Sequence, residues 1–231
     1  MSLTIVANYL RWRCLLTLLV ASCAMTSIGL AQTDEASPQE QPAWKALFDG
    51  KSLENWQRTN YGGEGQVGVK DGVLSLGFGS PLTGVTWNGD PLPKSNYEIE
   101  LEGRRVMGID FFCAMTFPVQ ENTCSFVVGG WAGSIVGLSN IDDEDASEND
   151  TTKYMSFKKN QWYKLRVRVT DKAITCWIDD KQVVQQPLKD KRISIRPEVE
   201  LNKPLGFCSF ETESELRNLR IRRLSKAEQD K

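Results

Sequence analysis

Hydrophobic and polar residues alternate along most of the chain, and no stretch of ten or more residues keeps the apolar period of a helix. The clearest example is residues 161–170, where Tyr163, Leu165 and Val167 alternate with basic side chains. In residues 97–102, three apolar side chains alternate with three glutamates in the same way. This pattern is typical of strands with one buried and one solvated face, so the chain is predicted to be all-β.

Turn-forming residues separate these runs, at residues 70–72, 88–90, 170–172 and 179–181. The spacing predicts about a dozen short antiparallel strands, and a sheet of that size usually divides into two packed layers. We therefore expect a β-sandwich or jelly roll with Greek-key connections. Helix is expected only as a turn near residues 52–56.

The first 31 residues have the pattern of a secretory signal peptide. Arg11 and Arg13 form a basic start, residues 14–30 are mostly apolar, and small residues precede a cleavage point after Ala31. A membrane anchor is the alternative, although several hydroxyl side chains interrupt the apolar run. Residues 20–23 also resemble a bacterial lipobox, in which Cys23 would receive a lipid anchor. Either processing route predicts an exported protein of the periplasm, cell envelope or extracellular space.

The remaining chain divides by composition into three parts. Residues 32–43 are predicted to be a polar tether, residues 44–225 the folded sandwich domain and residues 226–231 a polar tail. The chain has 28 basic and 30 acidic residues, and removal of Arg11 and Arg13 would leave 26 against 30, a net charge of −4. This balance argues against nucleic acid as a partner.

The sequence contains no histidine. This excludes Ser-His-Asp and Cys-His nucleophile systems and removes the usual nitrogen ligands of zinc and copper. Proton transfer would have to use Asp, Glu, Lys, Tyr or Cys. Any catalytic metal would therefore need a site built from oxygen ligands.

Four cysteines follow the predicted cleavage point, and they allow three complete pairings. Cys113 and Cys124 lie symmetrically about residues 118–119, so a hairpin there would place them opposite each other at disulfide distance. The alternative is four buried thiols, and Cys176 between Ile174 and Ile178 looks like a core residue. The absence of any C-x-x-C spacing argues against a structural zinc site.

Five segments resemble the 3-keto-disaccharide hydrolase domain family in the same order. They are residues 48–56 (FDGKSLENW), 69–74 (VKDGVL), 161–167 (QWYKLRV), 176–183 (CWIDDKQV) and 216–221 (LRNLRI). The resemblance covers most of residues 44–224. It implies a concanavalin-like jelly-roll sandwich, exported by a bacterium and acting on oxidised sugars, and it leaves catalysis and binding equally open.

One central stretch departs from the family pattern. Family members commonly continue from a strand like residues 108–112 (GIDFF) into an Arg and then a Tyr-Glu strand. Here Cys113 follows, and later Gly129, Gly130 and Trp131. The chain is therefore expected to be a divergent member.

Asp110 is the first candidate catalytic residue. We expect it inside an apolar strand, on the same face as Phe112 and Ala114, where a half-buried carboxylate suits general acid or base chemistry. The alternative is a structural ion pair with Arg104 or Arg105.

An acidic loop, defined as residues 140–152, holds six acidic residues in thirteen. Asp142, Asp143 and Asp145 are candidate ligands for Ca²⁺ or another divalent cation, although their spacing does not match an EF-hand. Glu148 is a candidate second catalytic carboxylate, and the amide of Asn149 a candidate substrate ligand. The alternative is a solvated loop without a ligand.

Aromatic side chains are candidates for stacking on sugar rings. Trp131 follows two glycines and is the first candidate, followed by Trp87, while Trp177 and Tyr61 are weaker ones. The other tryptophans considered are expected to be structural: Trp44, Trp56 and Trp162.

These residues support two hypotheses of different classes. In the first, the protein cleaves a 3-keto-glycoside: Asp110 removes the acidic C2 proton, while Arg104, a cation in the acidic loop or Asn149 stabilises the enolate. Asp110 and Glu148 could instead act as the carboxylate pair of an ordinary glycosidase. In the second hypothesis, the domain is a lectin-like envelope module that binds carbohydrate without catalysis.

Overall fold

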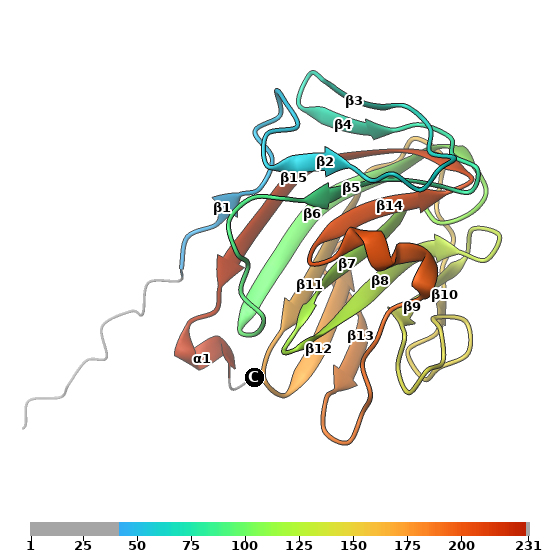
Figure 1. Ribbon diagram of the computed structural model, residues 1–231. Coiled ribbons are helices and arrows are strands. Elements are labelled where there is room, and N and C mark those ends of the chain that lie inside the picture. The colour runs from blue at the N-terminus through green and yellow to red at the C-terminus, as the bar shows by residue number, and fades with distance from the viewer. Residues whose placement is uncertain (1–41, 230–231) are drawn as a thin grey trace, which may run out of the picture. The chain divides into compact units, whose positions relative to one another are not determined.

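Two antiparallel β-sheets pack face to face in the computed structural model, which describes residues 42–229 (Figure 1). This range contains fifteen strands, one short 3₁₀ helix and one short α-helix. The prediction of an all-β jelly-roll sandwich is confirmed. The predicted signal peptide, the lipobox with Cys23 and most of the tether lie outside the described residues.

The first sheet has eight strands. Its spatial order is β13 (Lys181–Pro187), β12 (Ala173–Ile178), β11 (Tyr163–Val169), β6 (Tyr97–Gly108), β15 (Thr212–Arg223), β4 (Val73–Leu76) and β3 (Val67–Lys70), with β1 (Lys45–Ala46) also pairing with β15. The hairpins β3–β4 and β12–β13 have two-residue turns at 71–72 and 179–180, and all four turn residues have positive φ. These are the turns expected from the sequence.

The second sheet has seven strands. Its spatial order is β10 (Lys153–Tyr154), β9 (Ile135–Ser139), β8 (Asn122–Gly130), β7 (Cys113–Val119), β14 (Gly206–Phe210), β5 (Leu82–Trp87) and β2 (Trp56–Arg58). Strands distant in sequence lie side by side in both sheets, as β6 with β15 and β7 with β14. The chain therefore crosses repeatedly between the layers, which is the connectivity of a jelly roll.

The main hydrophobic core lies between the two sheets. Alternation along β6 directs Tyr97, Ile99 and Leu101 inward, where they are fully buried together with Phe117 and Phe207 of the seven-stranded sheet. The hydroxyl of Tyr97 donates a hydrogen bond of 2.6 Å to the Pro118 carbonyl, so the one polar atom of this side chain is paired. This core fixes which face of each strand turns outward.

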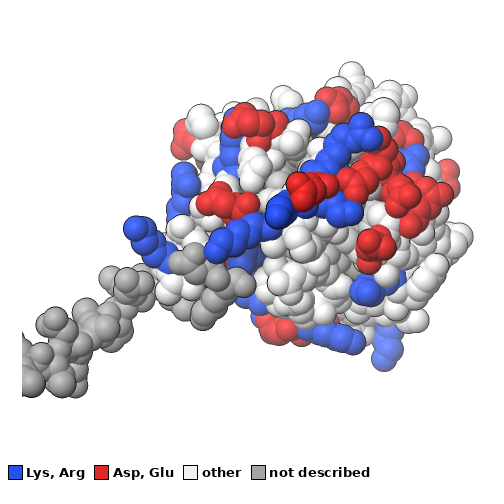
Figure 2. Space-filling model, turned by 90° about the horizontal axis from the view of Figure 1, so that it is seen from below, with Lys and Arg blue, Asp and Glu red and all other residues white. Residues whose placement is uncertain are grey.

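Charged and aromatic side chains cover the outer face of the eight-stranded sheet. Glu98 of β6 is fully buried there because Arg168 of β11 and Arg222 of β15 pair with its carboxylate, each through a hydrogen bond of 2.8 Å. Arg166 lies 4.4 Å above the ring of Trp177. Basic and acidic side chains also lie next to one another on the face shown in Figure 2. Their charges are therefore compensated locally.

The predicted disulfide between Cys113 and Cys124 is wrong. The β7–β8 hairpin exists, but its ladder places Cys113 opposite Val128 and Cys124 opposite Phe117, so each cysteine faces a residue four positions away from its expected partner. All four cysteines of the described residues are free and buried. Burial raises the pKa of the Cys124 and Cys208 thiols to about 12, so they behave as small apolar side chains.

The residues expected to form a polar tail begin with a short helix, α1 (Lys226–Gln229). Its Glu228 is buried against the outer face of the eight-stranded sheet, where Arg222 donates hydrogen bonds of 2.7 and 3.1 Å to the carboxylate. The backbone and hydroxyl of Ser225 donate to the same group. This contact fastens the chain end to the sheet.

We expect Glu228→Gln to lower the free energy of unfolding by about 2 kcal/mol at pH 7. Burial alone would raise the Glu228 pKa, but hydrogen bonds from Arg222 and Ser225 outweigh it and lower the pKa from 4.5 to about 2. The stabilisation is therefore complete above pH 4.5 and is lost as the pH falls toward 2. Denaturant unfolding of both proteins between pH 7 and pH 3 measures this. An equal difference at both pH values would show that Glu228 acts through packing alone.

No helix between residues 42 and 229 is long and apolar enough to cross a membrane.

Candidate functional site

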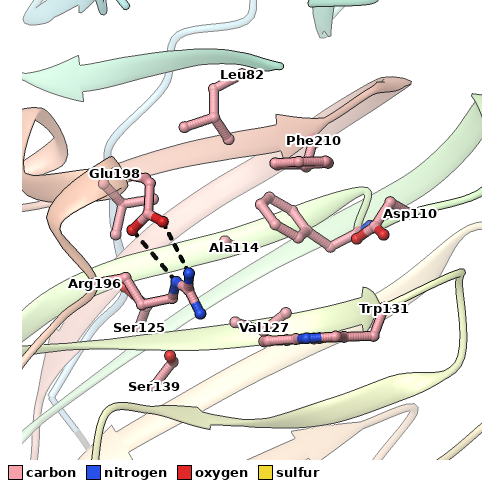
Figure 3. A pocket seen from close by; sticks show the side chains of 12 residues that line it. Leu82, Asp110, Ala114, Ser125, Val127, Trp131, Ser139, Arg196, Glu198 and Phe210 are labelled. Carbon is pink, nitrogen blue, oxygen red and sulfur yellow. Dashed lines mark hydrogen bonds and ion pairs between the residues drawn. The ribbon is translucent and has the colours of Figure 1, made fainter. Parts of the chain in front are cut away.

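A cleft of about 220 Å³ lies on the outer face of the seven-stranded sheet. This face is turned away from the main core and has a hydrophobic cluster of its own. Six apolar side chains, here called the apolar floor, line the cleft: Leu82, Phe111, Ala114, Val127, Val199 and Phe210. The cleft is the candidate functional site because polar side chains lie at its two ends (Figure 3).

Asp110 lies at one end of this cleft, in the turn between β6 and β7 rather than inside a strand as expected. The strand β6 ends at Gly108, so the predicted alternation stops before the aspartate. One carboxylate oxygen accepts the backbone N–H of Phe111 at 2.7 Å, and the other accepts that of Ala132 at 3.0 Å. Asp110 therefore joins its own turn to the turn between β8 and β9.

Trp131 lies beside Asp110 in the β8–β9 turn, and its side chain keeps 36% of its surface exposed. The turn has a special backbone: Gly129, Trp131, Ala132 and Gly133 all have positive φ. A side chain at Gly129 would come within 2.7 Å of the Arg105 guanidinium, so glycine is required there. The expectation that the two glycines present Trp131 to a ligand site is consistent with this geometry.

Arg105 holds the two turns together from behind. Its side chain points into the interior from β6, is 8% exposed, and donates hydrogen bonds of 3.0 to 3.2 Å to the carbonyls of Asp110, Gly129 and Gly133. Within residues 42–229 the Arg105 Nε has no hydrogen-bond partner, and burial lowers the pKa of the guanidinium. The guanidinium contacts the Asp110 carbonyl, so the expected structural ion pair with the carboxylate is replaced by a contact with the backbone.

Arg196 and Glu198 occupy the opposite end of the cleft, around the start of the 3₁₀ helix η1 (Pro197–Asn202). Figure 3 shows the two side chains paired, with Arg196 Nη2 and Glu198 Oε1 2.8 Å apart. Arg196 also donates a hydrogen bond of 2.6 Å to Asp145 of the acidic loop. Hydrogen bonding to Arg196 lowers the pKa of Glu198 and raises that of Arg196, so both stay charged.

Two serine side chains lie at the base of the cleft and are almost fully buried. The hydroxyl of Ser125 shares a hydrogen bond of 2.9 Å with Thr116, and the hydroxyl of Ser139 donates one of 2.7 Å to Asn140. Their hydrogen-bonding capacity is thus largely used within the protein.

Arg104, predicted to bind substrate, lies on the other side of the molecule. It follows the alternation of β6 and points out from the eight-stranded sheet, whereas the next residue points inward. Its guanidinium pairs with Glu215 at 2.6 Å and covers the ring of Trp162 at 4.6 Å. Arg104 therefore does not share the cleft with Asp110 and Trp131.

Glu148 and Asn149 do not line the cleft. Glu148 is exposed on the acidic loop and does not share the cleft with Asp110. Asn149 is 5% exposed, and its amide donates to the carbonyls of Leu138, Glu144 and Asp145. Its side chain therefore stabilises the conformation of the loop and does not line the cleft.

The predicted metal ligands are engaged by basic side chains instead. Asp142 pairs with Lys191 at 2.7 Å, Asp143 pairs with Arg192, and Asp145 pairs with Arg196. Lys191 lowers the pKa of Asp142 through this hydrogen bond. No three acidic or cysteine side chains within residues 42–229 gather closely enough to hold a metal ion. The acidic loop does not fit a calcium site.

The other aromatic candidates do not line the cleft. Trp87 is 7% exposed in the main core, stacks edge-on against Trp56 at 5.2 Å and donates its N–H to the Asp90 carbonyl. Tyr61 donates its hydroxyl to Asn202. Trp177 lies under an arginine of the eight-stranded sheet. Among the predicted stacking residues, the cleft contains Trp131 alone.

The apolar floor and the Arg196–Glu198 pair were not predicted from the sequence. These side chains come from β5, the β6–β7 turn, β7, β8, β14 and the region around η1, which are far apart in the chain and meet only after folding. Pro197 between the two charged residues is a common first residue of a helix, and it was the one local signal for η1.

Residues 43–222 match the 3-keto-alpha-glucoside-1,2-lyase-like domain family. The match covers more than half of the chain, so the protein belongs to this carbohydrate-related family. The resemblance predicted from the sequence motifs is thereby confirmed. No match was found among curated proteins.

Several solved structures share the fold at low sequence identity. A presumed glycosyl hydrolase from Parabacteroides distasonis is 13% identical, with 79% of this chain and 94% of that chain covered and a TM-score of 0.50. Domain 4 of AbnA, an extracellular arabinanase of Geobacillus stearothermophilus solved with arabinotriose, is 17% identical (82% and 97% covered, TM-score 0.51). The Crh5 transglycosylase in complex with NAG is 12% identical (80% and 86% covered, TM-score 0.52). These similarities establish the sandwich fold.

Proposed function

We propose that this domain binds 3-keto-glycosides in the cleft of the seven-stranded sheet and cleaves their glycosidic bond, with Asp110 as the base. The main observation in support is that Asp110 and Trp131 line the same end of one cleft and are joined through the Ala132 N–H. Membership of the 3-keto-alpha-glucoside-1,2-lyase-like family supports the choice of this substrate class.

Trp131 would provide the binding surface for the sugar. A pyranose has an apolar face of C–H groups, and an indole ring covers such a face well. Trp131 keeps 36% of its surface open, unlike the buried Trp56 and Trp87. The sugar would therefore lie against Trp131 with its edge toward Asp110.

The chemistry needs one base at this end of the cleft. The C3 ketone of the sugar acidifies the proton on C2. Asp110 would take that proton, the C–H electron pair would form the enolate, and the enolate would expel the oxygen substituent of C1, which is then protonated. Water adds across the resulting C1–C2 double bond and completes the hydrolysis.

Arg105 would hold the site in shape for this step. Its guanidinium lies outside the lining of the cleft and donates to the carbonyls of Asp110, Gly129 and Gly133, so it fixes the Asp110 and Trp131 turns relative to each other. This positioning role differs from the substrate contact that the sequence suggested for Arg104.

A glycosidase mechanism with two carboxylates has less support. Glu148 lies outside the cleft, and Glu198, the other acid that lines it, is held ionised by Arg196. An ionised carboxylate cannot donate the proton that a leaving group requires.

A non-catalytic carbohydrate-binding module is the second candidate. It is favoured by the fact that each oxygen of the Asp110 carboxylate already accepts a backbone N–H. A carboxylate used in this way could serve only to position Trp131. In that case the cleft would bind sugar without turnover.

Incubation of the purified protein with 3-keto-trehalose and with unoxidised trehalose tests the proposal. We expect release of monosaccharide from the keto-sugar alone, and at least about a tenfold loss of kcat/KM in Trp131→Ala. Trp177→Ala, on the opposite sheet, serves as the matched control and should keep its activity. Saturable binding without any product would support the binding module instead.

Export is part of the same proposal and has support from the sequence pattern of residues 1–31 alone. Mass spectrometry of the protein from its native host measures the mature N-terminus. Cleavage after Ala31 would indicate secretion, and a diacylated Cys23 would indicate a lipoprotein. A retained Met1 would contradict both routes.

A further inference from the structure

The middle of the cleft differs from a typical sugar site, because most of the side chains that line it are apolar. The apolar floor separates the Asp110–Trp131 end from the Arg196–Glu198 end (Figure 3). Phe111 and Phe210 lie together there with ring centroids 5.7 Å apart, and Leu82 and Val199 add aliphatic surface. A ligand that reaches from one end to the other must cross this floor.

The floor offers few hydrogen-bond partners to such a ligand. The hydroxyls of Ser125 and Ser139 are almost fully buried and already paired with Thr116 and Asn140. A pyranose carries hydroxyl groups around its whole edge, and these lose water on entering a cleft. Hydroxyls left without partners weaken binding, so a second sugar ring is a poor match for the floor.

We propose that the preferred ligands are aryl glycosides, in which the group attached to the sugar is a flat apolar ring that lies on the apolar floor. This inference rests on the function proposed above, which places the sugar at Trp131. An aryl ring needs no hydrogen bonds, gains from burial of its carbon surface and can stack against Phe210. The inference thus specifies the leaving group of the proposed reaction.

The size of the cleft agrees with this ligand. Its volume of about 220 Å³ is below the roughly 300 Å³ at which pockets for drug-sized ligands begin. One aryl ring on the floor, with the sugar at the open edge beside Trp131, uses this space. A long polysaccharide would need a groove that continues past both ends.

The far end of the cleft tolerates a polar substituent on the ring. Arg196 has five N–H groups, and three hydrogen bonds to Glu198 and Asp145 use its Nε, Nη1 and Nη2 once each. Two N–H groups therefore remain for a phenolic oxygen or a carboxylate at the distal position of the ring.

Calorimetric titration with three unoxidised ligands tests the inference, because a sugar without the ketone is not cleaved by the proposed chemistry. The ligands are methyl α-glucoside, phenyl α-glucoside and maltose, which differ in the group on C1. We expect phenyl α-glucoside to bind about tenfold more tightly than either of the others. 3-Keto-methyl-α-glucoside is tested in parallel for binding and cleavage.

Two variants of the apolar floor and one control test whether the floor causes the preference for the phenyl ligand. Phe210→Leu should reduce the advantage of the phenyl ligand to about twofold, and Val199→Thr, which adds a hydroxyl without changing shape, should improve maltose relative to the phenyl ligand. Leu201→Ser, on the same helix as Val199 but exposed and outside the cleft, should change neither. Thermal unfolding confirms that each variant is folded.

The outcomes separate this inference from the proposed function. If the keto-sugar is bound and cleaved but the phenyl group gives no advantage, the inference is overturned and the proposed function stands. If maltose binds best and Phe210→Leu weakens it equally, the floor is a second sugar site and the inference is again wrong. If the keto-sugar is neither bound nor cleaved, the proposed function fails, and the phenyl-to-methyl ratio still decides the ligand of the floor.

Discussion

Asp110→Asn is expected to reduce kcat for cleavage of 3-keto-glycosides by about 10² to 10⁴, the range that a positioned general base contributes. Asparagine has nearly the same shape, but its amide nitrogen cannot accept a proton or a backbone N–H. KM should change much less than kcat, because Trp131 and the apolar floor remain in place. Steady-state kinetics with 3-keto-trehalose gives both constants.

The variant also loses one hydrogen bond, since one of the N–H groups of Phe111 and Ala132 will face the amide nitrogen. The accompanying loss of stability should be about 1 kcal/mol, too small to unfold the domain. Glu148→Gln is the matched control, because this exposed carboxylate lies outside the cleft. If Asp110→Asn keeps kcat within about twofold of the parent, Asp110 is not the base.

Arg105→Met is expected to lower the free energy of unfolding by about 3 kcal/mol and to abolish saturable ligand binding. The three carbonyls that Arg105 holds, on Asp110, Gly129 and Gly133, would lose their common donor. The β6–β7 and β8–β9 turns would then no longer be fixed relative to each other. Denaturant unfolding and calorimetric titration measure the two effects.

Arg104→Met is the matched control, because it removes the same charge from the preceding residue of β6. That side chain pairs with Glu215 on the outer sheet face, where a partly exposed ion pair contributes about 1 kcal/mol or less. Arg105→Lys should lie between the two, because lysine keeps the charge but its side chain is one bond too short to bring its nitrogen to the position from which Nη2 contacts the three carbonyls. Equal stabilities of the Arg104 and Arg105 variants would contradict the role of Arg105.

The alternation of the sequence was sufficient to predict the strands that matter for the core. Tyr97, Ile99 and Leu101 are inward and fully buried, as expected. The same rule failed at Asp110, because β6 ends at Gly108 and the next residues form a turn. Local pattern thus predicted the faces of strands well and the geometry between strands poorly.

The register of the β7–β8 hairpin explains why the predicted disulfide is absent and why Asp110 and Trp131 lie together. The expected register paired Cys113 with Cys124, whereas the observed turn lies two residues later, between Val119 and Asn122. Continued outward, the observed register brings residue 110 toward residue 131, so this hairpin explains why Asp110 and Trp131 meet. The correct turn position would have predicted half of the site.

The other half of the cleft could not be predicted in this way. Arg196 and Glu198 reach the cleft because residues 188–196 leave the eight-stranded sheet and run along the acidic loop, with Asn140 and Ser194 exchanging backbone hydrogen bonds. Such contacts join segments about fifty residues apart, and nothing in the local pattern marks them. The basic residues that pair with Asp142, Asp143 and Asp145 belong to this segment. Because these partners are distant in the sequence, the sequence alone indicated a cation site in the acidic loop.

The ion pairs between the acidic loop and residues 191–196 should make ligand binding depend on the salt concentration around the domain. Asp142, Asp143 and Asp145 meet their basic partners at partly exposed positions, and the screening length falls from about 8 Å at physiological ionic strength to about 3 Å at 1 M salt, close to the length of these pairs. The sandwich core is apolar and is not weakened by screening. Concentrated salt would therefore loosen the Arg196 wall of the cleft before it affects the fold, so ligand affinity should respond to salinity while the melting temperature stays nearly constant.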